Sequence, residues 1–135
     1  MELVKTGAIV LDCAEPEELA YFYKELLGAK ECSDGTSSRT DIEAPSGLRI
    51  GFRRDLNATP SSWPRPEASL QAHLDFFVDA ENLDAVERRI VALGGIPVEA
   101  SGRSGGGPTS ARQYADPAGH SFTVRSSVRQ GPKTD

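Results

Sequence analysis

The sequence predicts an α+β fold made of two βαβββ modules in tandem. Three observations support this prediction. A short β-rich run followed by an amphipathic helix occurs near the start of the chain and again after its middle. Asp79 lies 67 residues after Asp12, and Gly94 lies 66 residues after Gly28, so the strand and the helix repeat in near register. Short strand-like runs separated by turn residues follow each helix.

The first module opens with residues 6–12, where side chains alternate between two faces as they do along a strand. Pro16 suits the first position of a helix, and Gly28 supplies its C-terminal stop. Leu19, Phe22 and other apolar residues between them recur at helical spacing. The strands expected after this helix lie near Ala29–Cys32, Arg39–Ile42 and Leu48–Arg53.

The second module opens with the clearest strand of the chain, His73–Val78. Its even positions are all apolar, which predicts that this face packs on a helix, while His73 and Asp75 lie side by side on the opposite face. Asn82 is the expected N-cap of the next helix, and Gly94 its stop. The strands expected after this helix lie near Ile96–Ala100, Arg112–Ala115 and Ser121–Arg125.

The 135 residues predict a single domain. We place module one at 1–53, a linker rich in Pro and Ser at 54–69, module two at 70–125, and a polar tail at 126–135. The glycine-rich segment 101–110 is followed by no helix-forming stretch and lacks a Gly-Lys-Ser/Thr ending, so it predicts a hairpin or lid rather than a phosphate loop.

Composition narrows the partners and the compartment. Hydrophobic residues make up 38% of the chain and charged residues 26%, as in a soluble globular protein. The formal net charge of -5 leaves no basic surface for nucleic acid or an anionic membrane. The N-terminal apolar run is too short for a signal peptide or a spanning helix, so we expect a cytoplasmic protein whose two cysteines are reduced.

The motifs HLDFFVD, which opens the second module, and DPAGHSFTV, which closes it, together with the duplication resemble the vicinal oxygen chelate superfamily. This superfamily includes glyoxalase I and bleomycin-resistance proteins. The phrase SSWPRPEASLQAHLDFFVD looks most like bacterial glyoxalase-like domain proteins. The resemblance spans nearly the whole chain. It implies that the modules form an open, curved, barrel-like sheet around a concave cavity with the helices outside, and that the chain forms a homodimer.

The resemblance also implies where metal ligands would stand, at Thr6, Gly51, His73 and Thr123. Only His73 is an ordinary metal ligand, because glycine has no side chain and a neutral threonine hydroxyl is a poor donor to a divalent ion. A rearranged site of His73, Asp75 and His120 is disfavoured, since His120 is expected to turn away at the start of its strand. We therefore expect no metal and no cofactor.

The side chains proposed to bind a ligand are Trp63, Arg49, Arg53, Phe77, Tyr114 and Thr123. Arg49 and Arg53 would give the cavity a positive patch for a carboxylate, phosphate or phenolate. Alternatively they pair with Asp75 or Glu43, or reach solvent. Trp63 supplies either a flat wall for an aromatic ligand or a plug between the modules.

His73 and Asp75 are the catalytic candidates. An imidazole oriented by a carboxylate can act as a general acid or base near neutral pH, although no nucleophile completes a triad. The other interpretation is structural: His73 bonds within the barrel wall, and Asp75 neutralises an arginine.

Two functions follow from these residues. The first, favoured by the incomplete ligand set, is metal-free binding of a small, partly apolar molecule that is anionic or aromatic. The second is a lyase or isomerase, metal-free or with an atypical metal, that uses His73 as general acid or base. A purely structural dimerisation module is a third interpretation.

Overall fold

The computed structural model describes residues 3–32, 39–58, 72–98 and 111–126. The chain forms two compact units, Met1–Thr59 and Pro60–Asp135. Most of the predicted linker, from residue 59 onward, lies outside the described ranges. No helix within those ranges is long and apolar enough to cross a membrane.

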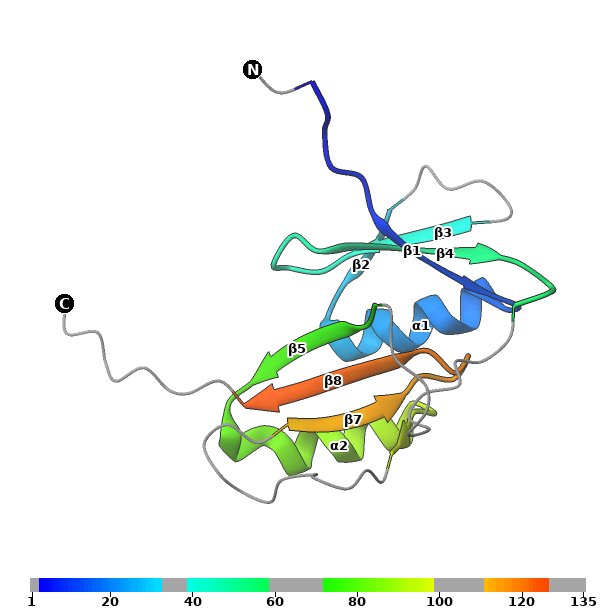
Figure 1. The fold of residues 1–135 in the computed structure, drawn as a ribbon. Coiled ribbons are helices and arrows are strands. Elements are labelled where there is room, and N and C mark those ends of the chain that lie inside the picture. The colour runs from blue at the N-terminus through cyan, green and yellow to red at the C-terminus, as the bar shows by residue number, and fades with distance from the viewer. Residues whose placement is uncertain (1–2, 33–38, 59–71, 99–110, 127–135) are drawn as a thin grey trace. The chain divides into compact units, whose positions relative to one another are not determined.

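The first unit is a four-stranded mixed sheet with a helix on one face (Figure 1). Its strand order is β1-β4-β3-β2, in which β1 runs parallel to β4 and the other neighbours are antiparallel. The elements, in chain order, are β1 (Ile9–Cys13), α1 (Pro16–Leu27), β2 (Lys30–Cys32), β3 (Arg39–Glu43) and β4 (Arg49–Arg54).

Helix α1 forms where the sequence predicts it. Pro16 stands in the first turn with two acidic residues, which complement the positive end of the helix dipole. The helix stops at Gly28, whose φ of 64° is left-handed and favours glycine. Its buried side carries Phe22 and Tyr23, and the Tyr23 ring stacks on Phe52 of β4 with 5.8 Å between centroids. Each large apolar side chain buried here stabilises the unit by roughly 1.5–3 kcal/mol.

The second unit repeats this topology. Its strand order is β5-β8-β7-β6, with β5 parallel to β8 and the other neighbours antiparallel. The elements, in chain order, are β5 (Leu74–Val78), a 3-10 turn (Ala80–Asn82), α2 (Leu83–Ala92), β6 (Ile96–Pro97), β7 (Ala111–Ala115) and β8 (Ser121–Ser126). The predicted α+β fold with two repeats of one strand–helix plan is confirmed, and neither four-stranded sheet closes on itself.

The contact between α2 and its sheet is partly polar. Tyr114 of β7 is fully buried, and its ring stacks on Phe122 of β8. The Tyr114 hydroxyl donates to Oε1 of Glu87 in α2 at 2.7 Å, and Arg112 donates to the same oxygen at 3.3 Å. Burial, followed by the bond to Glu87, raises the pKa of Tyr114 well above its usual value. A neutral tyrosine therefore holds the helix to the sheet through a charged partner.

Some boundaries differ from the prediction. The first strand begins at Ile9, which pairs with Ile50 of β4, rather than at residue 6. His73 likewise precedes β5 instead of opening it. Asn82 lies at the N-cap of α2 but makes no side-chain capping bond, since the 3-10 turn leads directly into the helix.

Candidate functional site

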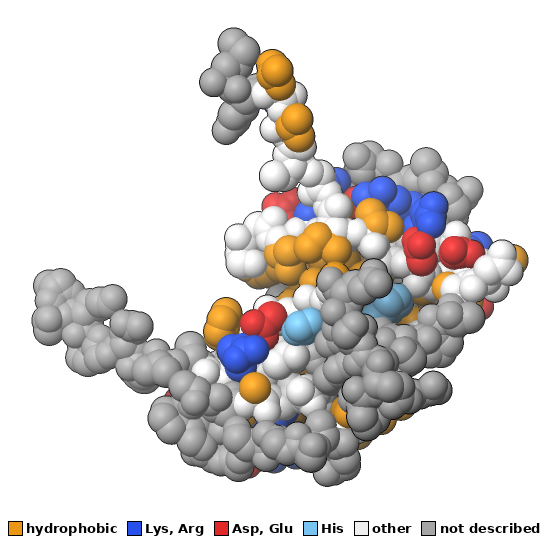
Figure 2. All heavy atoms as spheres, in the orientation of Figure 1, with side chains coloured by type: hydrophobic (Ala, Val, Ile, Leu, Met, Phe, Trp, Pro, Cys, Tyr) orange, Lys and Arg blue, Asp and Glu red, His pale blue; other side chains and the backbone are white. Residues whose placement is uncertain are grey.

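Each sheet has one face under its helix and one face away from it, which we call the open face. In β4 the side chains under the helix, Ile50 and Phe52, are fully buried, so alternation places Arg49, Gly51 and Arg53 on the open face as predicted. Basic and acidic side chains lie next to one another on the surface of the first unit (Figure 2). The residues of the four strands on the open face of the first sheet are Val10, Asp12, Lys30, Cys32, Arg39, Asp41, Glu43, Arg49, Gly51 and Arg53.

The centre of this face is a buried carboxylate held by two arginines, which we call the Asp41 cluster (Arg39, Asp41 and Arg49). Arg39 donates to both oxygens of Asp41, from Nε at 2.6 Å and from Nη2 at 2.9 Å. Nε of Arg49 lies 3.7 Å from Oδ2 of Asp41. The side chain of Asp41 is only 8% exposed. The hydrogen bonds from Arg39 lower the pKa of Asp41, against the opposing effect of burial, and the charge of Arg49 adds to this.

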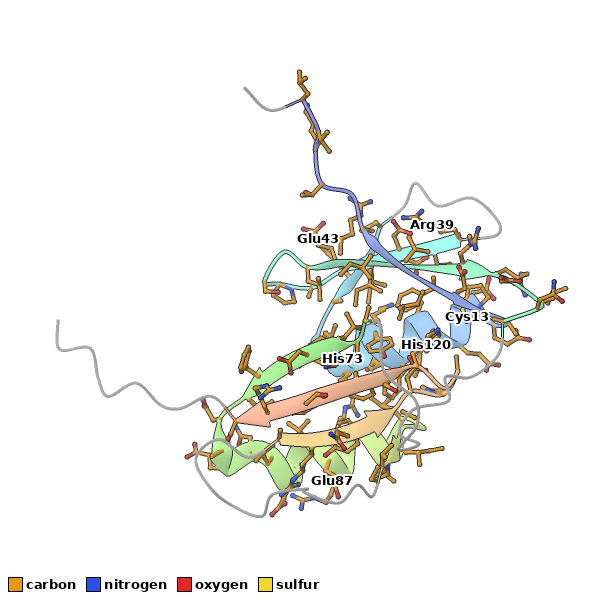
Figure 3. All side chains as sticks on the ribbon, in the orientation of Figure 1. Cys13, Arg39, Glu43, His73, Glu87 and His120 are labelled. Atoms are coloured by element: carbon orange, nitrogen blue, oxygen red, sulfur yellow. The ribbon has the colours of Figure 1, made fainter. Side chains whose placement is uncertain are left out.

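Gly51 makes room for the Asp41 cluster. A Cβ at this position would lie 2.8 Å from Oδ1 of Asp41 and 2.9 Å from Nε and Nη2 of Arg39. The ion pair therefore lies directly over the backbone of β4, where any larger residue would displace it. Arg39 and Glu43 both stand on the face of β3 away from α1 (Figure 3).

Arg53 is engaged elsewhere. Its guanidinium binds both carboxylate oxygens of Asp12, at 2.8 Å each, on an exposed part of the face. Asp12 lies directly across from Arg53 in the parallel pairing of β1 and β4. Arg53 therefore pairs with an acid that the sequence analysis did not name, and not with Asp75 or Glu43. Sequence reasoning missed Arg39, which the alternation along β3 could have placed beside Asp41.

On the second sheet, Asp75 is bound by an arginine. Nε of Arg125 donates to its two oxygens at 3.1 and 3.2 Å. An acidic and a basic side chain adjoin on the surface over β5 and β8 (Figure 2). His73 is exposed just before β5. Of the two interpretations of these residues, the one in which Asp75 neutralises an arginine matches the contacts, and Asp75 does not orient His73.

A carboxylate-oriented imidazole does exist in the second unit, but it belongs to His120. Nδ1 of His120 lies 3.1 Å from Oδ2 and 3.2 Å from Oδ1 of Asp116. The Asp116 carboxylate is buried and also accepts from the backbone N–H groups of Ala118 and His120. The turn between β7 and β8 thus holds the ring by one nitrogen. The four-residue spacing of Asp116 and His120 within DPAGH was the available sequence indication.

The other predicted ligand-binding residues occupy different places. Thr123 lies on the open face of the second sheet, nearly buried between Asp75 and Gln113, and Phe77 is 63% exposed on the same face. Tyr114 does not reach this face. Tyr114 lies across from Phe122 of β8, and both side chains are on the face covered by α2. The expectation that Tyr114 faces a ligand is therefore wrong. Trp63 lies outside the described residues.

The first unit also has a small cleft on its helix side. Its volume of about 170 Å³ is well below the ~300–1,000 Å³ typical of pockets for small organic ligands. The cleft is lined by Glu17, Ala20, Tyr21, Lys24, Glu31, Thr40 and Ile42. It lies under α1, on the opposite side of the sheet from the Asp41 cluster.

The residues present do not fit a divalent metal at the four implied positions. Gly51 offers no donor, and the space above it holds the Asp41–Arg39 pair. Thr6 and His73 are exposed, and Thr123 has only a hydroxyl. Within the described ranges, no three or more His, Cys, Asp or Glu side chains are grouped so as to hold a metal ion.

The family model of the glyoxalase-like domain matches residues 8–125. The chain belongs to this family. Its resemblance to the glyoxalase and bleomycin-resistance group is thereby confirmed. Comparison with curated protein sequences finds no match.

Solved structures show the same fold at low identity. A fosfomycin resistance protein, FosX from Listeria monocytogenes, in complex with Mn(II) and 1S,2S-dihydroxypropylphosphonic acid, is 16% identical, with a TM-score of 0.68 over 95% of each chain. A glyoxalase/dioxygenase from Nostoc punctiforme is 20% identical, with a TM-score of 0.68 over 93% of this chain and 92% of that one. At these identities, the similarity between this chain and the two solved structures concerns the fold alone.

Proposed function

We propose that this glyoxalase-like protein binds a small, anionic organic molecule on the open face of its first sheet without using a metal ion. The observation that carries the proposal is the substitution of a cationic cluster for a metal-ligand position. Where the family resemblance implies a ligand to a metal, Gly51 lies beneath the Asp41–Arg39 pair, with Arg49 beside it. The positive charge at this position comes from guanidinium groups.

The distribution of side chains supports an anionic ligand with an apolar part. The open face of the first sheet carries the Asp41 cluster, and the apolar side chain of Val10, which is 37% exposed, lies across from Gly51 on the same face. Small-molecule sites combine apolar surface with a few polar groups that orient the ligand. The complex of the fold-related FosX contains a phosphonic acid, which is an anionic small molecule, together with Mn(II).

The experiment is elemental analysis combined with native mass spectrometry of the full chain purified from cells in buffers free of chelators. We expect no divalent metal at stoichiometric level and a small co-purified molecule, or its binding from a metabolite extract, detected as a mass increment. A tightly held metal ion present at one equivalent per chain would contradict the metal-free proposal. A protein that retains and takes up no small molecule would contradict binding.

The second candidate function is metal-free acid–base catalysis by a lyase or isomerase. The observation in its favour is the His120–Asp116 pair, because a buried carboxylate that binds one ring nitrogen orients the imidazole as a general base requires. His73, which lacks such a partner among the described residues, is the less favoured acid or base. Conversion of a co-purified molecule by the parent but not by His120→Asn would support catalysis, and unchanged conversion would exclude this role.

Association into a homodimer stays a prediction from the family resemblance. Light scattering coupled to size-exclusion chromatography would test it directly, because a dimer would have twice the 14.5 kDa mass of the chain.

A further inference from the structure

The cleft on the helix side of the first unit lies between α1 and the strands β2 and β3. The most deeply buried residues that line it are Ala20 and Ile42, which are 6% and 1% exposed. Its volume of about 170 Å³ is similar to the ~150 Å³ of an engineered cavity that takes up benzene. The cleft is therefore large enough for one planar group of a ligand.

The polar side chains around this cleft include two acids and one base. Glu17 and Lys24 come from α1 and Glu31 from β2, and two glutamates with one lysine give a formal charge of -1. Among the described residues, no hydrogen bond or ion pair engages the side chains of Glu17, Tyr21 or Glu31. Tyr21 is 57% exposed at the cleft, and aromatic rings attract cations. The cleft therefore favours a ligand group with a single positive charge.

The two units can be aligned residue by residue around the cleft. Strands β2 and β6 each begin two residues after the glycine that follows the helix, so Glu31 corresponds to Pro97. Glu31 pairs with Ile42, and Pro97 pairs with Tyr114. In the second unit this position thus carries a tyrosine, whose hydroxyl reaches a glutamate of the helix. The shorter Ile42 of the first unit leaves room between the strand and the helix.

A second pair of positions shows the same difference. Thr40 and Arg112 are each the second residue of their strand, and Glu17 and Asp84 are each the second residue of their helix. In the second unit, Nη2 of Arg112 lies 2.9 Å from Oδ1 of Asp84. There the strand supplies a guanidinium to the carboxylate of the helix. In the first unit the strand supplies only the hydroxyl of Thr40.

From this comparison we propose that the cleft between α1 and the strands β2 and β3 binds a planar cationic group, a guanidinium or an amidinium, of a small organic molecule. The group takes the place that Arg112 and the ring of Tyr114 occupy in the second unit, and it donates to Glu17 and Glu31. Planar cations bind carboxylates through paired, charge-assisted hydrogen bonds. This site lies on the other side of the first sheet from the Asp41 cluster and binds the opposite charge, so it does not depend on the proposed function.

The test is an NMR titration of the full chain with benzamidine, in which an amidinium group is attached to a single ring. Benzamide, its neutral isostere, is titrated in parallel, and NaCl keeps the ionic strength constant. We expect saturable shifts with benzamidine at residues 17–24, at Glu31 and at residues 40–42, and at least about tenfold weaker binding of benzamide. Equal affinity for the two compounds, shifts that do not saturate, or saturable shifts confined to other parts of the chain would overturn the proposal.

Two neutral substitutions test the carboxylates. Glu17→Gln and Glu31→Gln preserve the size of the side chain and remove one charged acceptor, so each should weaken benzamidine binding about threefold or more. The matched control is Glu18→Gln, which removes the same charge from an adjacent, exposed position of α1 that does not line the cleft. It should change the affinity by less than about twofold. Equal losses in Glu17→Gln and Glu18→Gln would leave only diffuse attraction and overturn the site.

The substitution Thr40→Arg introduces the residue of the second unit into the cleft. Its guanidinium should bind Glu17 as Arg112 binds Asp84, and benzamidine binding should fall by more than about tenfold. Thr40→Ser, which adds no bulk, is the control and should bind within about twofold of the parent. Urea unfolding shows whether both variants are folded. Undiminished binding to folded Thr40→Arg would overturn the site, and if that variant does not fold, the comparison of Glu17→Gln with Glu18→Gln decides.

Discussion

The two units share one topology but differ on the face that topology leaves open. In each, an arginine near the end of the last strand binds an acid of the first strand: Arg53 binds Asp12, and Arg125 binds Asp75. Beyond that, the first open face is ionic, whereas the corresponding positions of β7 and β8 carry small or uncharged side chains. The two units therefore share a buried apolar helix side, which stabilises the common topology, and differ in the side chains of the open face, which the topology does not require.

The helix sides also differ in how they are joined. In the first unit the contact is aromatic, with Tyr23 stacked on Phe52 and edge-on to Phe22. In the second unit, a tyrosine hydroxyl reaches a glutamate of the helix. A buried apolar contact depends on volume and shape, whereas a buried hydrogen bond depends on protonation as well.

The largest expected effect is the loss of a helix-side aromatic. Phe52→Ala should destabilise the protein by about 3–5 kcal/mol, because Phe52 is fully buried and its removal leaves a cavity. Phe77→Ala, on an open face and 63% exposed, should change stability by less than about 0.5 kcal/mol. Urea unfolding of both variants measures the difference. Equal losses would show that Phe77 is buried in the folded protein, contrary to the distinction between faces.

A smaller effect is expected at the centre of the first open face. Asp41→Asn should cost on the order of 1–3 kcal/mol at pH 7, since it weakens a shielded, charge-assisted pair. Because the folded pKa of Asp41 lies below the unfolded value of about 3.9, its stabilisation is present above that pH and is lost as the pH falls through the folded pKa. The parent and the variant should therefore converge at acid pH.

Urea unfolding at a series of pH values from about 7 down to about 2 tests this convergence. The matched variant Asp75→Asn removes the partner of an exposed arginine in the second unit and should cost only about 0–1 kcal/mol. A stability difference between the parent and Asp41→Asn that is the same at every pH would be evidence against a charged Asp41 in the folded protein.

Tyr114→Phe should destabilise the second unit by about 1–2 kcal/mol through loss of the bond to Glu87. The raised pKa of Tyr114 means that the folded state favours the neutral phenol. Its stabilisation is complete below the unfolded pKa of about 10 and is lost as the pH rises above that value. The difference between the parent and Tyr114→Phe should thus shrink in alkali. Tyr21→Phe, at an exposed position of α1, is the control and should be neutral.

The smallest effects are expected for the two ion pairs that the units have in common. Double-mutant cycles on Asp12–Arg53 and on Asp75–Arg125 should each give a coupling of about 0–1 kcal/mol, because all four side chains are well exposed. The coupling should decrease at high salt. A coupling in either pair as large as the loss from Phe52→Ala would mean that the open faces contribute to the fold as much as the helix sides do.

Much of the architecture was predictable because it depends on local patterns. Alternation along 48–53 was sufficient to separate Ile50 and Phe52 from Arg49 and Arg53, and Gly28 marked the end of α1. Side chains alternate between two faces along a strand, and glycine adopts a left-handed backbone conformation readily. Both properties can be recognised from a few consecutive residues.

The candidate site was predictable only in part. Arg49 was expected on its face and lies there, and one interpretation had Asp75 neutralise an arginine, as Arg125 shows. The partner of Arg53, which is Asp12, was not anticipated. The oriented histidine, His120, depends on a turn whose carboxylate folds back on the ring. The face on which a side chain lies follows from its position along the strand, whereas its binding partner depends on how distant strands pair.

The sequence by itself determined the repeat and the helix side of each sheet, because these follow from residue type and periodicity. Only the tertiary structure decided that Asp41 draws Arg39 and Arg49 together over Gly51 and that Tyr114 faces α2. The physical reason is strand register: a shift of one residue would pair different charges and turn each side chain to the other face, and that register is chosen by contacts between residues far apart in the chain.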